Sequence, residues 1–291
     1  MLFHSSYTAL LTPFKDNKVD YSSYREIIDF QINNGTHGLV PVGTTGESPT
    51  LSHDEHKKLI EVCIEQSNGR VPVIAGAGSN STSEAVDFVK HACSAGTDGL
   101  LVVTPYYNKP TQSGLLAHYK ELIKHASKPI IIYDIPGRSV IQMTDKTMAE
   151  LAQDRFIVGV KDATADLTRP TRLQNVISDD FIQLSGEDGT ALAYLAAGGH
   201  GCISVTANIA PNLLSRMHNA WKQGDINTAQ EINKKLMPLH DALFCETSPG
   251  PLKYAASLLG ICSSNVRLPL VEIEEDSKFK VKNALKQTGM I

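Results

Sequence analysis

The sequence lacks the features that mark several classes of protein. No apolar run approaches the roughly 18 residues that a membrane-spanning helix requires. Residues 1–7 lack the basic region and the long apolar region of a signal peptide. The 27 Lys and Arg residues are outnumbered by 31 Asp and Glu residues, which gives a formal net charge of −4. Because binding to phosphates needs clustered basic residues, we expect neither nucleic-acid nor membrane binding.

Paired cysteines are also missing. The cysteines are odd in number and widely spaced, and none belongs to a CxxC pair of the kind that binds zinc or performs redox chemistry. We therefore expect no metal site, and we expect reduced thiols in a cytoplasmic protein, where disulfides are rare. The five cysteines are Cys63, Cys93, Cys202, Cys245 and Cys262.

Short apolar runs alternate with helix-length segments along the chain. The runs are rich in Val, Ile and Leu, and few alternate strictly with polar residues, which is typical of parallel strands buried on both faces. Eight such strands alternating with helices predict an α/β fold, the (β/α)8 TIM barrel. A doubly wound open sheet is the alternative, because a strand count does not prove closure. The runs are Tyr7–Thr12, Gly38–Val42, Val71–Ala75, Gly99–Val103, Pro129–Tyr133, Phe156–Lys161, Phe181–Ser185 and Gly201–Val205.

Helix-start signals precede several of the intervening segments. The stretches Ser52–Glu55 and Ser81–Glu84 both match the capping-box pattern, in which a serine and a glutamate three residues later satisfy each other's backbone N–H groups. Asp20 and Thr144 are expected to cap two further helices.

The pattern changes after Val205, where only helices are predicted. We therefore divide the chain into a catalytic barrel of residues 1–223 and a C-terminal helical segment of residues 224–291. The predicted helices are Pro211–Gln223, Ile226–Leu243, Pro251–Leu259 and Ser277–Lys286.

Lys161 stands at the end of a wholly apolar run, Phe156–Val160. In a (β/α)8 barrel the active site lies at the C-terminal ends of the strands. An ammonium at the edge of an apolar site is desolvated, which favours the neutral amine. A neutral amine can attack a ketone and form an iminium, an electron sink for carbanion chemistry. The alternative is a lysine whose ammonium reaches into solvent.

Other polar residues are predicted beside Lys161 at the barrel mouth, the end of the barrel where the C-terminal ends of the strands meet. Tyr133 ends the preceding strand, about 4.8 Å away, and could shuttle the protons of Schiff-base formation. Thr44 and Thr45 could donate hydrogen bonds to a carboxylate, which their flanking glycines would let approach. Arg138 carries a planar fork that suits a carboxylate. Each of these residues has an alternative interpretation. Tyr133 could be an interfacial aromatic residue with its hydroxyl in water, Thr44 and Thr45 could form only a tight turn, and Arg138 could be a loop residue exposed to solvent.

Several motifs together resemble those of one enzyme family. They are Gly43–Glu47, Thr104–Asn108, Tyr133 with Pro136 and Arg138, Lys161 with Ala163 and Thr164, Leu184–Gly186, Gly198–Ala207 and Leu236–His240. They are similar to motifs of the class I pyruvate-dependent aldolases, and within them of the dihydrodipicolinate synthase family, over essentially the whole chain. The resemblance implies a lyase that condenses pyruvate with L-aspartate 4-semialdehyde, the first committed step of lysine biosynthesis through diaminopimelate. It also implies a homotetramer, built as a dimer of tight dimers, that needs no metal and no organic cofactor.

The resemblance also implies roles for individual residues. Lys161 would carry the Schiff base with pyruvate, and Tyr133, Thr44 and Tyr107 would relay protons, with Tyr107 reaching the active site of a neighbouring subunit. Arg138 would hold the carboxylate of the semialdehyde. Pyruvate would be contacted by Thr45 and by the backbone at Gly186 and Ile203.

Many members of this family have a feedback site for L-lysine at the dimer interface. A carboxylate, an amide and a phenol stand at the matching positions and suit the charged ends of an amino acid, so we expect inhibition by lysine. Two histidines of this set are spaced i, i+3, but they lack a third ligand and do not predict a metal. The matching residues are Ser48, His53, His56, Asn80, Glu84 and Tyr106.

The chain departs from the family pattern at a few positions. Asp134, Ser139 and Asp162 stand where Asn, Thr and Glu are frequent, and Ala165 replaces a frequent Gly. We expect the added charge of Asp134 to weaken the hold of Arg138 on a carboxylate.

Three other functions compete with this one. A sialic acid or 2-keto-3-deoxy sugar acid lyase of the same superfamily would need more hydroxyl partners for its long substrate. A phosphate-binding barrel could use Gly198–Gly201, but this loop precedes the eighth strand and lies on the face opposite the mouth. A non-catalytic sensor of small acids would need no amine nucleophile.

Overall fold

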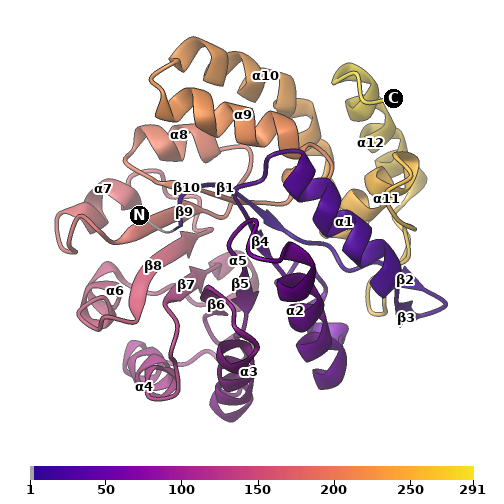
Figure 1. The fold of residues 1–291 in the computed structure, drawn as a ribbon. Helices are drawn as coiled ribbons and strands as arrows, with labels where there is room; N and C mark the ends of the chain where they lie inside the picture. Colours follow the sequence, from indigo (N-terminus) through magenta and orange to yellow (C-terminus); the bar gives the residue numbers. More distant parts are fainter. Residues whose placement is uncertain (1–2) are drawn as a thin grey trace. The chain divides into compact units, whose positions relative to one another are not determined.

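The computed structural model describes residues 3–291 (Figure 1). The chain forms two compact units. The first comprises residues 3–4 and Pro72–Ile203, and the second comprises Ser5–Val71 and Ser204–Ile291. The predicted division between residues 223 and 224 stays a prediction. Among the described residues, no helix combines the length and the apolar character needed to cross a membrane.

The first unit is built on a parallel sheet of six strands. The strands are β5 (Ile74–Gly76), β6 (Gly99–Val103), β7 (Ile130–Asp134), β8 (Ile157–Asp162), β9 (Ile182–Ser185) and β10 (Gly201–Ser204). They pair in sequence order. The central strands carry β-branched side chains that are fully buried, among them Ile130, Ile131 and Ile132. Burying each such side chain stabilises the fold by about 1.5–3 kcal/mol.

Helices connect these strands. The helices are α3 (Thr82–Ala95), α4 (Gln112–Ile123), α5 (Pro136–Ser139), α6 (Asp145–Leu151), α7 (Arg169–Gln174) and α8 (Ala191–Ala196). Helix α4 contacts α3 on one side and α6 on the other, and α6 contacts α7, so these helices form a continuous outer layer (Figure 1). All five residues of β7 are buried, so both faces of this strand are shielded from solvent, as its near-continuous apolar sequence predicted.

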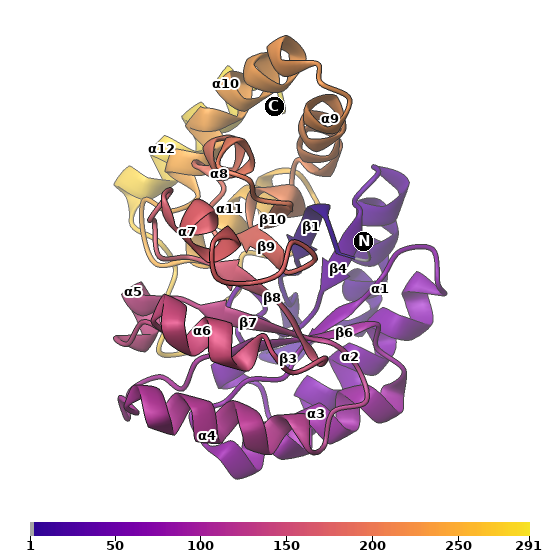
Figure 2. The same ribbon diagram turned by 90° about the vertical axis from the view of Figure 1, so that its left-hand side faces the viewer.

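The second unit holds the remaining two parallel strands, a hairpin, the helices α1 and α2, and the helices that follow β10. Strands β1 (Ser5–Ala9) and β4 (Gly38–Val40) pair in parallel, and β2 (Phe14–Lys15) pairs with β3 (Lys18–Val19) in an antiparallel hairpin that the sequence did not predict. Helix α10 packs between α9 and α12, and α12 also contacts α11 (Figure 2). The helices are α1 (Tyr21–Asn33), η1 (Ser48–Thr50), α2 (His53–Ser67), η2 (Thr206–Asn208), α9 (Pro211–Lys222), α10 (Ile226–Ala242), α11 (Gly250–Leu258) and α12 (Glu275–Gln287).

The eight predicted parallel strands are confirmed, with differences at their ends. The strand Gly99–Val103 has the predicted bounds, whereas β5 begins at Ile74 rather than at Val71. The four helices predicted after Val205 are also present as α9 to α12. Strand ends shift because the apolar run continues beyond the last ladder hydrogen bond, so composition alone cannot mark them.

Most predicted helix caps are confirmed. Ser52 and Glu55 form a reciprocal capping box at the start of α2, with Ser52 N donating to Glu55 Oε2 at 2.9 Å and Glu55 N donating to Ser52 Oγ at 3.2 Å. The carboxylate of Asp20 caps α1, and the hydroxyl of Thr144 caps α6. A cap of this kind stabilises a helix by about 1 kcal/mol.

The capping box predicted at Ser81 and Glu84 is wrong. The side chain of Ser81 accepts no cap hydrogen bond and instead lies 3.1 Å from the hydroxyl of Ser83. The Glu84 carboxylate accepts a hydrogen bond from the hydroxyl of Ser79. The Glu84 carboxylate therefore binds the Ser79 hydroxyl instead of the backbone N–H of Ser81, which the capping-box pattern had assigned to it.

Candidate active site

Lys161 and Tyr133 lie side by side at the ends of two neighbouring strands. They are register partners of β8 and β7, as the sequence predicted. The Lys161 Nζ atom stands 4.0 Å from the centroid of the Tyr133 ring, and both residues are only 5% exposed. The electron-rich ring face attracts the cation when Lys161 is protonated. The structure thus holds an amine in a nearly closed environment, with a phenol as its neighbour.

A buried guanidinium lies on the other face of the same two strands. Arg169, at the start of α7, donates from Nη1 to Asp134 Oδ2 at 2.8 Å and lies 3.5 Å from Asp162 Oδ1. The side chains of Arg169 and Asp134 are fully buried. Because successive side chains of a strand point to opposite faces, Asp134 and Asp162 anchor the strand ends that carry Tyr133 and Lys161.

The expectation that Asp134 weakens the hold of Arg138 on a carboxylate stays a prediction. The Asp134 carboxylate also accepts a hydrogen bond from the backbone N–H of Met143 at 3.2 Å, so it faces the layer between the sheet and α7. Burial raises the pKa of Asp134 to about 6, and the charge of Arg169 acts in the opposite direction. Sequence reasoning missed Arg169 because a lone arginine at a helix start carries no periodic signal.

Gly186 follows β9 and lies against the end of β8. Its backbone N–H donates to the carbonyl of Asp162 at 2.7 Å. A Cβ atom at this position would lie 2.8 Å from the Cβ of Ala163, so only glycine allows the two chains to approach this closely. Gly186 is thereby placed one strand away from Lys161, whose register partner in β9 is Leu184.

Glu187 is an additional polar residue near the lysine that sequence reasoning did not assign. Its side chain is half-buried, and its backbone N–H donates to the hydroxyl of Ser185 at 3.1 Å. Burial raises the pKa of Glu187 and the charge of Asp188 raises it further, whereas the charges of Lys161 and Arg138 lower it. The Glu187 carboxyl group therefore lies within the electrostatic influence of both Lys161 and Arg138.

The remaining predicted residues of the first unit lie at strand ends or beyond them. Ile203 is buried in β10. Arg138 is exposed on the short helix α5. Tyr107 follows β6 with a left-handed backbone, φ +74°, and its side chain is 86% exposed. Such a backbone is rare for a large side chain and holds the ring outward.

Thr44 and Thr45 lie in the loop after β4, in the second unit. The loop is closed by backbone hydrogen bonds from Gly46 N to Gly43 O at 3.1 Å and from Glu47 N to Thr44 O at 3.0 Å. The Gly46 carbonyl accepts a 2.7 Å hydrogen bond from Thr12 Oγ1. These contacts fix a tight turn in which Thr45 is buried and Thr44 is half-buried.

The six residues expected at a lysine site fall into two groups. In the first unit, Glu84 and Tyr106 meet around the hydroxyl of Ser79, which binds the Glu84 carboxylate. Burial raises the pKa of Tyr106, as does the nearby charge of Glu84. Asn80, next to Ser79, accepts a hydrogen bond at its carbonyl from Asn108 Nδ2 at 2.8 Å. The second unit carries the other three on η1 and in the first turn of α2, namely Ser48, His53 and His56.

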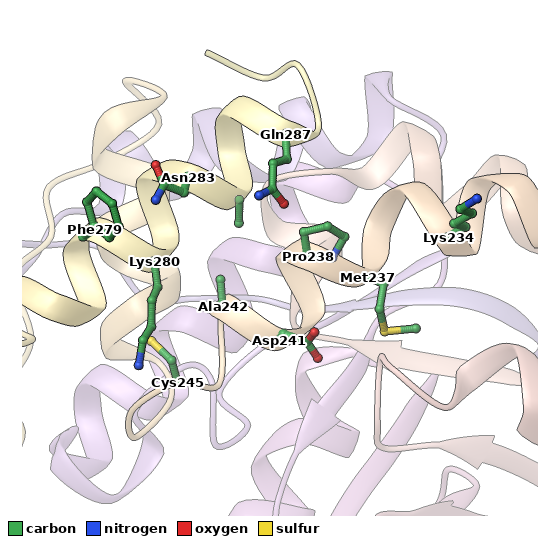
Figure 3. Close-up of a pocket in the computed structure, with 11 residues that line it drawn as sticks. Lys234, Met237, Pro238, Asp241, Ala242, Cys245, Phe279, Lys280, Asn283 and Gln287 are labelled. Atoms are coloured by element: carbon green, nitrogen blue, oxygen red, sulfur yellow. The ribbon is translucent and has the colours of Figure 1, made fainter.

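The described residues contain no metal-binding cluster, and one surface cavity of the second unit contains none of the predicted site residues. No group of three or more His, Cys, Asp or Glu residues within residues 3–291 is placed to hold a metal ion. A cavity of about 520 Å³ lies between α10 and α12 (Figure 3). It is lined by residues such as Met237, Asp241 and Phe279, and by none of the predicted site residues.

Comparisons with known proteins cover nearly the whole chain. The profile of the Dihydrodipicolinate synthetase family matches residues 2–288. The 4-hydroxy-tetrahydrodipicolinate synthase of Rhodospirillum centenum is 57% identical over 290 residues, which is 100% of each chain. A dihydrodipicolinate synthase from Acinetobacter baumannii, solved in complex with pyruvate, is 40% identical with a TM-score of 0.96 over 100% of each chain. The enzyme from Cyanidioschyzon merolae, solved with lysine bound, is 37% identical with a TM-score of 0.96, covering 100% of this chain and 99% of that one.

This similarity establishes the fold and the family together. The eight parallel strands, the helices that connect them and the C-terminal helices α10 to α12 are those of a (β/α)8 barrel with a helical extension. A family profile that spans the chain agrees with the lysine and tyrosine found side by side. The chain belongs to the dihydrodipicolinate synthetase family.

Proposed function

We propose that this chain is a lyase that condenses pyruvate with L-aspartate 4-semialdehyde to 4-hydroxy-tetrahydrodipicolinate, in the diaminopimelate route to lysine. The observation that carries the proposal is the buried amine of Lys161 over the ring of Tyr133. The name of the Rhodospirillum centenum relative and the pyruvate complex of the Acinetobacter baumannii enzyme support it. A cytoplasmic location agrees with the free thiols of all five cysteines.

The reaction needs only an amine and a route for protons. The Lys161 amine attacks the ketone carbon of pyruvate, and water leaves to give an iminium. Loss of a proton from the pyruvate methyl group gives an enamine. The enamine carbon adds to the aldehyde carbon, the aldehyde oxygen takes up a proton to become a hydroxyl group, and the iminium is restored. The amino group of the semialdehyde then attacks the iminium carbon, which closes the ring and frees Lys161. Every intermediate stays on the protein's own lysine, so no organic cofactor and no metal is required.

Other predicted residues serve the two substrates in this proposal. Thr45 and the backbone at Gly186 and Ile203 bind pyruvate, and Arg138 binds the carboxylate of the semialdehyde, since guanidinium and carboxylate are geometrically matched. Tyr133, Thr44 and Tyr107 relay protons. The exposed ring of Tyr107 supports a role in the active site of a neighbouring subunit, within a homotetramer formed as a dimer of dimers.

Trapping the Schiff base tests the proposal directly. Borohydride with pyruvate should leave a stable mass increase on the peptide that contains Lys161, and semialdehyde should be consumed by the untreated enzyme. A sialic acid or a 2-keto-3-deoxy sugar acid, assayed in parallel, should not be cleaved. The absence of an adduct would instead favour a sensor of small acids, and cleavage of a sugar acid would favour the related lyases.

Inhibition by L-lysine is a second expected result. The cluster of Ser79, Glu84 and Tyr106 offers a carboxylate and a phenol to an amino acid, and the Cyanidioschyzon merolae enzyme binds lysine. Millimolar-range L-lysine should lower the rate, and Glu84→Gln should weaken the inhibition because it removes the charge that faces an ammonium. A wild-type rate that is unaffected by L-lysine would remove the idea.

A further inference from the structure

A buried ion pair joins the Thr44–Thr45 loop to helix α11. Glu47, two residues beyond Thr45, is 2% exposed, and Lys253 of α11 is fully buried. The Lys253 Nζ atom lies 2.5 Å from Glu47 Oε1 and donates to the carbonyl of Asn265 at 2.7 Å. Burial lowers the pKa of Lys253, and the Glu47 charge opposes this effect. Glu47 and Lys253 thus form a fully desolvated ion pair directly next to the Thr44–Thr45 loop.

The Glu47 carboxylate is also held from a third segment. Its Oε2 atom accepts a hydrogen bond from the backbone N–H of Arg267 at 3.0 Å. The ring of Phe14 lies under both cations, 4.0 Å from Lys253 Nζ and 4.3 Å from the Arg267 guanidinium. Glu47 itself has a left-handed backbone, φ +56°. A non-glycine residue keeps this conformation only where its surroundings enforce it, and here two contacts to its carboxylate do so.

Arg267 extends the contact to the first turn of α2. Its guanidinium donates two hydrogen bonds to the Glu55 carboxylate, at 2.7 and 2.6 Å, and one to the Thr50 carbonyl at 2.9 Å. Glu55 belongs to the capping box that starts α2, and His53 and His56 flank it. Arg267 therefore contacts both Glu47, which follows the Thr44–Thr45 loop, and the first turn of α2, which carries two of the expected lysine-site residues.

A stabilising role alone does not explain this arrangement. Replacing a buried ion pair by apolar residues is often neutral or stabilising, so a buried pair is weak evidence for stability. What a charge pair supplies is directional geometry, and the geometry here converges on Glu47. We propose that Glu47, Lys253 and Arg267 are positioning residues that hold the Thr44–Thr45 loop in its pyruvate-binding conformation and couple that loop to the first turn of α2. The proposal rests on the function proposed above.

The test separates positioning from stability by comparing two variants. Lys253→Met should raise the KM for pyruvate by about tenfold or more, because small displacements of binding groups are costly, while the reduced adduct still forms on Lys161 at saturating pyruvate. The double variant Glu47→Gln with Lys253→Met removes both charges and should regain stability without regaining the pyruvate KM. A double variant with the wild-type KM would overturn the proposal, because the pair would then be structural only.

Two further variants complete the design. Lys278→Met is the matched control, since Lys278 of α12 also contacts two carboxylates, at 2.6 and 2.8 Å, without touching the loop. It should keep the wild-type KM. Arg267→Met should keep adduct formation but raise the lysine concentration for half-inhibition by about fivefold or more. Unchanged inhibition in Arg267→Met would refute the coupling to α2. Failure of the wild type to form an adduct would refute the proposed function instead.

Discussion

Replacing Lys161 by methionine should abolish both the borohydride-trapped pyruvate adduct and the condensation. Without the amine no iminium can form, and the rate should fall by at least about 10³-fold because the covalent route is lost. Methionine retains an apolar stem beside the Tyr133 ring, so the side chain that is 5% exposed is replaced without a large cavity. Mass spectrometry of the reduced protein and a coupled rate assay measure the two losses.

The control for the Lys161→Met variant is a measurement of its stability. Urea unfolding should give a midpoint close to that of the wild type, since Lys161 makes its closest cation–ring contact with a single neighbour, Tyr133. An adduct that persists in Lys161→Met would mean that a different lysine is the nucleophile. Lys253, which is also fully buried, would then be the first residue to map.

Arg169→Met should strongly destabilise the protein by leaving buried carboxylates without their cation. Arg169 is fully buried, pairs with Asp134 at 2.8 Å and lies 3.5 Å from Asp162. Removing one partner of a buried pair costs about 3–5 kcal/mol, because the remaining charge is uncompensated. Urea unfolding at about pH 8 should therefore show a loss of this size in the free energy of unfolding.

This loss should depend on pH in a defined direction. The folded pKa of Asp134, about 6, lies above its ordinary value of 3.8, so the folded protein holds this proton more tightly than the unfolded chain does. The stability from this group is therefore lost as the pH rises through that window. Without Arg169 the pKa of Asp134 rises further, so the deficit of the variant should shrink between about pH 8 and pH 5.5. Adding Asp134→Asn should restore part of the stability, and an equal deficit at both pH values would contradict the assignment.

Features with a local signature were accessible from the sequence. The eight strands are recognisable in the sequence as apolar runs, and the order of strands in a barrel predicts that Tyr133 and Lys161 are neighbours, which the register of β7 and β8 confirms. The Ser52–Glu55 capping box is likewise a pattern of four consecutive residues. Each of these rests on periodicity or on adjacent strands, which a single sequence encodes directly.

Contacts between distant segments were not accessible in this way. Arg169 meets Asp134 across 35 residues, and Arg267 meets Glu55 across 212. Neither arginine stands in a periodic pattern, and a charged residue usually indicates an exposed surface. The capping box at Ser81 failed for a related reason, because the geometry of the loop brought the Ser79 hydroxyl to Glu84.

The contact between the Glu47 carboxylate and a segment far away in the sequence has a consequence for folding during synthesis of the chain. The carboxylate accepts a hydrogen bond from the backbone N–H of Arg267, which lies 220 residues later in the chain. A chain emerging from the ribosome can fold its early strands long before these partners exist, since segments generally fold in the order of their synthesis. The Thr44–Thr45 loop therefore acquires its final conformation only after residue 267 has been made, and shorter fragments lack the contacts that organise it.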